Sequence, residues 1–170
     1  MFDIQNFSNR FQIKELTKND MDDVLIFCQN NTIYYHYHPV MLDKKQLLDD
    51  LFSLPPKTKR KDKYLVGFYE KETLIAILDL IDGYPFEDYA YIGFFMVNKE
   101  YQGLGIGSFL IEELIHYIKG QGYQAIRLAV DKGNPQSYTF WTKHHFQKTG
   151  EEVHDGIYTY YPMELYLMEQ

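Results

Sequence analysis

The apolar and polar positions of this chain alternate with two different periods, which divide it into strands and helices. Apolar and polar residues take turns from Phe11 to Leu16, which is typical of a half-buried strand. Two further runs, Tyr64 to Glu70 and Thr73 to Ile81, are rich in aliphatic and aromatic residues and are separated only by Lys71 and Glu72. The pattern therefore predicts an N-terminal strand and, later in the chain, a β-hairpin.

Other segments repeat their apolar residues every three to four positions, as one face of a helix does. They predict a helix that begins after a cap at Thr17 or Asn19 and ends near Asn30, and further helices over residues 44–52, 106–119 and 135–144. Asp43 and Asn134 are placed to cap the second and the last of these. Between the first two helices, residues 34–39 are predicted to form an aromatic loop.

Four more runs complete the predicted sheet. Residues 89–97 precede the long helix, 125–130 follow it as an almost wholly apolar strand, and 146–153 and 158–167 close the chain. The strand–helix–strand unit from Tyr89 to Val130 should be parallel and right-handed, whereas the other neighbours should be antiparallel. The fold class expected is α/β (α+β), with a mixed, mostly antiparallel sheet of about six to seven strands flanked by about four helices.

Length and composition narrow the class of protein. The chain has 170 residues, of which 45% are hydrophobic, so we expect one domain, residues 1–170, with a hydrophobic core. Its net charge of −7 argues against nucleic acid as a partner, because a phosphate backbone binds basic surfaces. Cys28 is the only cysteine, no signal-peptide pattern opens the chain, and no apolar run approaches the roughly 20 residues that cross a bilayer. We therefore expect a soluble, cytoplasmic protein without a membrane partner.

A glycine-rich turn lies between the strand that ends at Val97 and the long helix. It reads Gln102-Gly103-Leu104-Gly105-Ile106-Gly107-Ser108. Glycines at alternate positions let backbone N–H groups approach a ligand with no Cβ in the way, and the start of the helix adds unpaired donors and the positive end of its dipole. The turn therefore indicates a binding site for a phosphate or diphosphate.

Known phosphate-binding motifs differ from this turn. The dinucleotide pattern G-x-G-x-x-G would need a third glycine at Ser108 or Leu110, and the nucleotide P-loop would need a lysine before Ser108. The turn fits neither. A glycine turn that serves only the close packing of strand and helix stays open as the alternative without a ligand.

The turn resembles the signature of the GNAT superfamily, the acyl-CoA-dependent N-acetyltransferases, in which Gln or Arg, two further residues and Gly-x-Gly or Gly-x-Ala follow a strand. Gln102, Gly105 and Gly107 match this signature. A second pattern of the superfamily, one strand later, is matched by Asn134, Ser137, Phe140, Lys143 and Phe146, with Trp141 at the position of its tyrosine. The resemblance covers roughly residues 64–167. It implies a GNAT-like fold with a central pair of parallel strands that splay apart, and acetyl-CoA (coenzyme A) as the cofactor.

The resemblance also implies, position by position, which residues bind coenzyme A. The splayed strands would be 89–97 and 125–130, with the pantetheine arm between them and the diphosphate on the turn. The residues implied to bind the cofactor are Phe95, Met96, Val97, Gln102, Gly103, Leu104, Gly105, Ile106, Gly107, Ser108, Asn134, Ser137, Trp141 and Lys143. His145 replaces a glycine of the pattern, and if the turn there still needs positive φ, histidine tolerates it better than most residues but not freely.

The chain departs from the superfamily where the catalytic residues are expected. The usual general acid is a tyrosine, and Trp141 occupies its place, although an indole N–H donates a hydrogen bond without being a useful proton source. Tyr138, one turn earlier, is the alternative acid. Tyr91 stands where many relatives carry a glutamate base. Asp79 is therefore the candidate base, with Asp82, Glu87 and Asp88 as alternatives.

An acceptor pocket is expected between the first two helices, where Tyr34, Tyr35 and His36 could line a site for an amine, partly through cation–π contacts. No third ligand accompanies His36 and His38, so no metal site is expected. The function indicated is transfer of an acetyl group from acetyl-CoA to a primary amine of a small molecule, peptide or protein, by a monomer or homodimer. A catalytically silent acyl-CoA-binding module and a nucleotide-binding protein are the alternatives.

Overall fold

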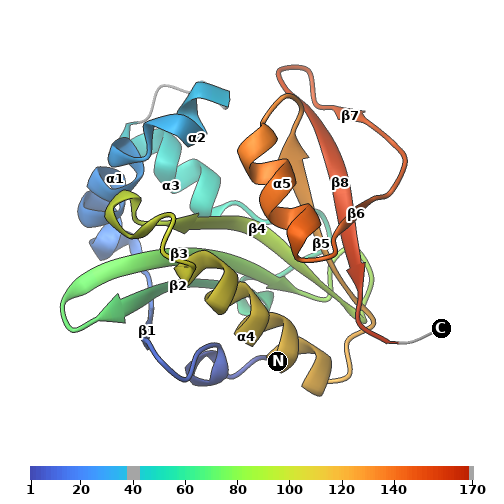
Figure 1. Cartoon of the computed structure of the whole chain (residues 1–170), viewed down its shortest axis with the longest axis horizontal. Coiled ribbons are helices and arrows are strands. Elements are labelled where there is room, and N and C mark those ends of the chain that lie inside the picture. Colours follow the sequence, from blue (N-terminus) through green and yellow to red (C-terminus); the bar gives the residue numbers. More distant parts are fainter. Residues whose placement is uncertain (38–42, 169–170) are drawn as a thin grey trace.

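The computed structural model describes residues 1–37 and 43–168, which form one eight-stranded sheet with helices on both faces (Figure 1). The strands are ordered β1-β2-β3-β4-β5-β8-β6, and β7 also pairs with β8. Their bounds are β1 Gln12–Glu15, β2 Lys63–Glu70, β3 Thr73–Asp82, β4 Tyr89–Val97, β5 Ala125–Asp131, β6 Gln147–Lys148, β7 Val153–His154 and β8 Thr159–Tyr166. Neighbouring strands are antiparallel except β4 and β5, which are parallel.

Five α-helices and four short 3-10 helices connect these strands in the described part of the chain. The α-helices are α1 Met21–Asn30, α2 Thr32–Tyr37, α3 Lys44–Phe52, α4 Ile106–Gly120 and α5 Pro135–Lys143. The 3-10 helices are η1 Ile4–Asn6, η2 Lys18–Asp20, η3 Arg60–Asp62 and η4 Lys99–Tyr101. Of the α-helices, none is long and apolar enough to cross a membrane within the described ranges.

Two helices begin at the capping residues that the sequence predicts. The side chain of Asp43 accepts a hydrogen bond from the N–H of Gln46 at the start of α3. Asn134 accepts one from the N–H of Ser137 at the start of α5, where Pro135 takes the first helical position and needs no N–H partner. Each cap pairs a backbone donor that the helix itself leaves unpaired, and so fixes where the helix begins.

The helices cover the two faces of the sheet with two separate hydrophobic cores. On one face, α4 buries Leu110, Leu114 and Ile118 against the sheet, and α5 adds Trp141. On the opposite face, α1 and α3 pack their apolar residues against the half of the sheet that β2, β3 and β4 form. This second core contains Met21, Val24, Phe27, Leu47, Leu51, Leu65, Ile77 and Met96. The sheet is therefore the middle layer of three (Figure 1).

The parallel pair β4–β5 is paired over only part of its length. Its register runs from Tyr89 opposite Ala125 to Ile92 opposite Leu128. Beyond Ile92, β4 continues beside β3 to Val97, and β5 continues beside β8 to Asp131. The two strands thus separate at their C-terminal ends, as the resemblance predicts.

A β-bulge marks the residue after the last parallel pair. Asp79 of β3 lies opposite Phe94 and Leu80 opposite Ile92, so Gly93 is an extra residue of β4. The bulge exchanges the two faces of the strand. Ala90 and Ile92 lie in the α4 core before it, and after it this core is contacted by Phe95 and Val97, whereas Phe94 and Met96 pack in the other core.

The structure corrects two predictions of local structure. Residues 34–37 are helical, as part of α2, rather than a loop. The ring centroids of Tyr34 and of Phe94 in β4 are 5.7 Å apart. This tertiary contact favours a helix that the local sequence does not predict. The remainder of the predicted aromatic loop, including His38 and Pro39, lies outside the described residues.

The predicted strand over residues 146–153 is two short strands, β6 and β7, so the sheet has eight strands rather than six or seven. Gly150 lies between them at φ +101°, in a conformation that glycine adopts most easily. His145 has φ +67°, which confirms the expected positive φ at the position where the pattern has a glycine.

Candidate active site

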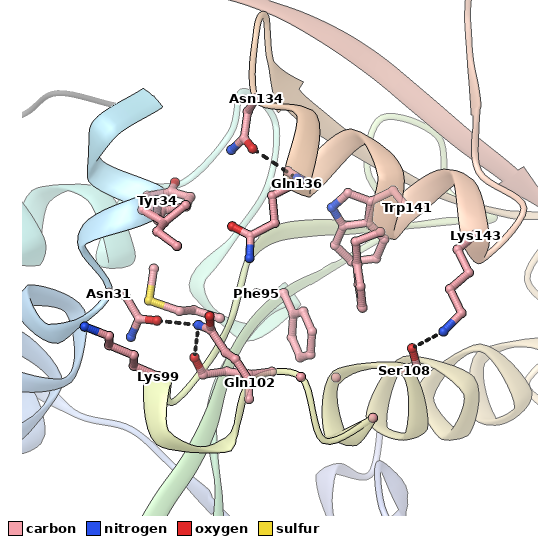
Figure 2. Close-up of a pocket in the computed structure, with 18 of the residues that line it drawn as sticks. Asn31, Tyr34, Phe95, Lys99, Gln102, Ser108, Asn134, Gln136, Trp141 and Lys143 are labelled. Carbon is pink, nitrogen blue, oxygen red and sulfur yellow. Dashed lines mark hydrogen bonds between the residues drawn. The ribbon is translucent and has the colours of Figure 1, made fainter.

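The described residues line a cleft of about 680 Å³ at the place where β4 and β5 separate. The glycine-rich turn and the start of α4 form its floor, α5 forms one wall, and the end of α1 with α2 forms the other (Figure 2). Its lining residues are Asn31, Thr32, Ile33, Tyr34, Phe95, Met96, Val97, Lys99, Gln102, Gly103, Gly105, Gly107, Ser108, Asn134, Gln136, Ser137, Phe140, Trp141 and Lys143.

The backbone of the turn needs glycine at two positions for its conformation and at a third for space. Gly103 and Gly105 have φ values of +75° and +80°, in the left-handed region that side chains disfavour. Gly107 lies inside α4, and a Cβ there would approach Val97 Cγ2 to 3.3 Å and Phe140 Cε2 to 3.4 Å. The first two glycines therefore shape the turn, and Gly107 lets β4, α4 and α5 meet closely.

The start of α4 presents backbone donors to the cleft. Gly105 is the N-cap, and the first N–H that bonds back to it belongs to Phe109, at 3.0 Å. The N–H groups of Ile106, Gly107 and Ser108 precede that bond and have no partner within the helix. They form the positive end of the helix dipole, which suits an anionic group.

Cations accompany these donors. Lys99 and Lys143 both line the cleft, and no acidic side chain is among its described lining residues. Lys143 Nζ donates to Ser108 Oγ at 3.2 Å (Figure 2). His144 Nε2 lies 3.0 Å from the same oxygen. Burial lowers the pKa of His144, so its imidazole is neutral at physiological pH. The cleft is thus positively charged in a chain whose net charge is −7.

The side chain of Gln102 joins the turn to the opposite wall. Its Nε2 donates to Asn31 Oδ1 at 2.6 Å and to the carbonyl oxygen of Val97 at 2.9 Å. Asn31 is the buried C-cap of α1, and its own amide donates to Phe27 O at 2.8 Å. One amide therefore links the end of α1, the end of β4 and the turn.

Aromatic rings fill the wall that α5 provides. Trp141 is 6% exposed and packs edge-on against Phe140 at 5.0 Å and Phe146 at 5.1 Å between ring centroids. Phe95 of β4 stacks on Phe140 at 6.1 Å. The cluster gives the cleft an apolar wall beside its cationic floor.

Most of the residues that the resemblance implies for the cofactor come together around this cleft, and two do not. Leu104 points outward with 69% of its surface exposed, and Ile106 is buried in the α4 core. Among the acceptor candidates Tyr34 lines the cleft, whereas Tyr35 and His36 are outside its lining. Tyr138, the alternative acid, is 38% exposed and carries Lys148 Nζ over its ring at 4.8 Å, away from the cleft.

Asp79, the candidate base, is also outside the lining of the cleft. It is buried on the face of the sheet that α1 and α3 cover, and its Oδ2 accepts a hydrogen bond from Lys63 Nζ at 2.6 Å. Burial raises its pKa, and Lys63 opposes that rise. Tyr91 lies in the same region, and burial raises its pKa to about 12, so its phenol stays protonated.

Sequence reasoning did not assign six of the lining residues to the site: Asn31, Thr32, Ile33, Lys99, Gln136 and Phe140. Phe140 was named only as part of the second pattern, and the structure places it in the wall of the cleft. Lys99 had a usable signal, since it is a cation just before a turn that indicates an anion site. Gln136 had none, because helix positions two residues apart do not face the same side and only the structure shows it beside Asn134 in the lining. Asn31 to Ile33 had none either, since the end of α1 and the start of α2 bring them to the cleft.

Comparisons with known proteins agree with this fold. Residues 29–146 match the model of the acetyltransferase (GNAT) family. A search of curated proteins found no match.

Solved structures share the fold at low identity. An acetyltransferase from Thermus thermophilus has a TM-score of 0.72 at 18% identity, with 92% of this chain and 96% of that chain covered. The ribosomal-protein-S18-alanine N-acetyltransferase from Escherichia coli has a TM-score of 0.64 at 16% identity, with 94% and 95% covered. The PaiA N-acetyltransferase from Thermoplasma acidophilum, solved in complex with coenzyme A, has a TM-score of 0.63 at 18% identity, with 92% and 98% covered.

Proposed function

Because the chain belongs to the GNAT acetyltransferase family, which uses acetyl-CoA, we propose that it transfers an acetyl group from acetyl-CoA to a primary amine. The acceptor would be carried by a small molecule, a peptide or a protein, and residues 1–170 would act as one domain. The observation that carries the proposal is the cationic, glycine-lined floor of the cleft at the splay of β4 and β5.

The floor fits the diphosphate of coenzyme A. The free N–H groups at the start of α4 would donate to its oxygens, and Gly103 and Gly105 leave open space above the backbone because a Cβ at either would meet nothing within 4 Å. Lys99 and Lys143 would add charge-assisted hydrogen bonds. An anion of this kind would find no carboxylate to repel it among the described lining residues.

The splay fits the arm of the cofactor. Beyond Ile92 the backbone of β4 no longer pairs with β5, so the N–H and C=O groups of Phe95 and the N–H group of Val97 would be available to an amide-bearing chain laid between the strands. The carbonyl of Val97 already accepts a hydrogen bond from Gln102 Nε2. Asn134 would meet that chain from the β5 side. The apolar wall of Trp141 and Phe140 would exclude water from it.

Acetyl-CoA supplies the acetyl group as a thioester, whose thiolate is a good leaving group. In the transfer, a C–N bond forms with the amine and the C–S bond breaks. A backbone N–H near Phe95 or Met96 would stabilise the negative charge that develops on the carbonyl oxygen. The Trp141 indole would pack against the arm and could donate a hydrogen bond, but it would not deliver a proton.

The amine must lose protons, and the acceptor side offers polar groups rather than an obvious base. Tyr34 faces the cleft from α2 and would contact the acceptor, through its ring or its hydroxyl (Figure 2). Water in the open cleft would accept the proton that the amine loses. Asp79 is held by Lys63 outside the cleft lining and would take no proton in this step.

The test measures binding and turnover separately. Calorimetry with acetyl-CoA, NAD and ATP is followed by a CoA-release assay over amino acids, peptides, polyamines and aminoglycosides. We expect acetyl-CoA alone to bind, and at least one amine to release CoA. Binding without release from any amine would favour the catalytically silent acyl-CoA-binding module. Binding of NAD or ATP in place of acetyl-CoA would overturn the cofactor assignment.

A further inference from the structure

A buried ion pair lies directly beneath the bulge of β4. Lys63 of β2 and Asp79 of β3 have side chains that are 2% and 6% exposed, with Nζ and Oδ2 2.6 Å apart. The other carboxylate oxygen, Oδ1, is buried without a hydrogen-bond partner in the described part of the chain. Neither residue lines the cleft.

The carboxylate of Asp79 occupies the space that a side chain at position 93 would fill. A Cβ on Gly93 would lie 2.5 Å from Asp79 Oδ2 and 3.2 Å from its Cγ. Gly93 does not have a left-handed φ, so its backbone conformation is open to other residues. Glycine is therefore required at 93 because of the carboxylate, and the two positions are specified together.

Position 93 matters because the cleft-lining residues of β4 all come after it. The bulge lies one residue beyond the last β4–β5 pair, at Ile92, and it sets which face each later residue of β4 presents. Phe95, Met96 and Val97 line the cleft. Anything that fixes the bulge therefore fixes the backbone groups assigned to the cofactor arm and to the carbonyl oxygen.

Other charged and titratable groups of the described ranges, 1–37 and 43–168, do not give the carboxylate a second hydrogen-bond partner. Arg60, before β2, lowers the pKa of Asp79 from a distance, and Tyr91 of β4 lies within its electrostatic reach with a phenol that stays neutral. A buried ion pair is weak support for stability, because removing two charges from water costs about as much as their attraction returns. Its retention here calls for a reason other than stability alone.

We propose that the Lys63–Asp79 pair is a positioning element that holds the Gly93 bulge and thereby orients the peptide groups of β4 that face the thioester. Asp79 acts by its shape and its hydrogen bond to Lys63, not as the base that takes a proton from the amine. This inference rests on the proposed function for its kinetic consequences, but the placement of the bulge does not depend on it.

Three variants separate positioning from proton transfer. Asp79→Asn keeps the shape and can still accept a hydrogen bond from Lys63, so kcat should stay within about fivefold with an unchanged pH profile. Gly93→Ala drives a Cβ into the carboxylate, and kcat should fall about 10- to 100-fold while the Kd of acetyl-CoA changes less than about threefold. In Gly93→Ala/Asp79→Ala the new methyl has room, so kcat should exceed that of Gly93→Ala alone.

The opposite results would overturn the proposal. A base at position 79 predicts that Asp79→Asn loses about 100-fold or more in kcat together with the acidic limb of its pH profile, and that the double variant is at least as impaired as Gly93→Ala. Asp79→Asn and Asp79→Ala both leave the Lys63 ammonium without a charged partner. If either variant does not fold, Lys63→Met is added to every variant that changes Asp79.

A readout without catalysis keeps the proposal testable if the wild type shows no turnover with any amine. Amide hydrogen exchange of residues 93–97 should speed up about tenfold or more in Gly93→Ala and Asp79→Ala, relative to β2 and to β5 in the same molecules. Unchanged exchange in this segment would overturn the positioning role, whatever the outcome of the CoA-release assay.

Discussion

The two walls of the cleft are built on different principles. The first, named here the backbone wall, is the wall of α5 together with the floor that the glycine turn and the start of α4 form. It depends on backbone: N–H groups at a helix start, and glycines required by φ or by the 3.3 and 3.4 Å approaches that a Cβ would make. The wall of α1 and α2 uses side chains on a helix of six residues, Thr32–Tyr37, which is attached to the turn through Asn31 and Gln102.

This difference indicates what each wall can recognise. A backbone cradle suits a ligand part that is always the same, such as a diphosphate, because its geometry hardly changes with the side chains around it. A short helix that presents Tyr34 can change its side chains without disturbing the sheet. We infer that the first wall serves the cofactor and the second serves the acceptor, and variants of each wall test that division.

The largest effect is expected at the backbone wall. Gly107→Asp adds a side chain where Val97 and Phe140 are already close, and it places a negative charge beside the diphosphate site. The affinity for acetyl-CoA should fall by about 100-fold or more, as calorimetry would measure. Gly120→Asp at the far end of α4, where a Cβ meets nothing within 4 Å, is the matched control and should bind normally. Normal binding by both variants would remove the turn from the cofactor site.

An intermediate effect is expected at the side-chain wall. Tyr34→Ala should lower kcat/KM for the acceptor about 10- to 100-fold, because a buried aromatic contact is lost, and leave the Kd of acetyl-CoA within about threefold. His36→Ala on the same helix, outside the cleft lining, is the control and should change neither constant appreciably. A weaker affinity of Tyr34→Ala for acetyl-CoA, with unaltered acceptor kinetics, would contradict the division between the walls.

The smallest effect is expected at the link between the walls. Gln102→Ala removes the hydrogen bonds to Asn31 Oδ1 and Val97 O, and leaves Asn31 Oδ1 unpaired. The free energy of unfolding should drop by about 1 to 3 kcal/mol, and acetyl-CoA affinity and acceptor kinetics should both weaken about three- to tenfold. Gln136→Ala, from the same cleft but with no such link, should change the unfolding free energy by about 0.5 kcal/mol or less. A loss confined to one ligand would show that Gln102 belongs to one wall only.

The fold could be predicted from the sequence wherever local signals agree with tertiary contacts. The caps at Asp43 and Asn134 place α3 and α5 as the structure has them, and the hairpin across Lys71 and Glu72 is found between β2 and β3. The glycine turn before α4 can be recognised in the sequence as an anion-binding turn, because its φ values and its unpaired N–H groups are set by residues that are neighbours in the chain.

The remainder depends on contacts between distant residues. Gly93 reads as one more small residue in an apolar run, and only its register against β3 shows that it is a bulge. The sequence favours Asp79 as a base because nothing in it joins this residue to Lys63, sixteen positions away on the neighbouring strand. The role of each site residue stays a prediction until the variants are measured.

The bulge at Gly93 also has a consequence for how the length of β4 is constrained. Four consecutive residues, Phe94 to Val97, pack alternately in the two hydrophobic cores. Their pairing register against β3 is shifted by one residue from the register of Ala90 and Ile92. Leu80 lies opposite Ile92 and Asp79 opposite Phe94, so deleting Gly93 would restore an unbroken register and leave Phe94 to Val97 on their present faces. Inserting or deleting a residue beyond Phe94 would instead move the residues that follow to the opposite core. Beyond the bulge, β4 can therefore substitute side chains but cannot gain or lose a residue without exchanging the two cores, whereas at the bulge itself a change of length leaves both cores in place.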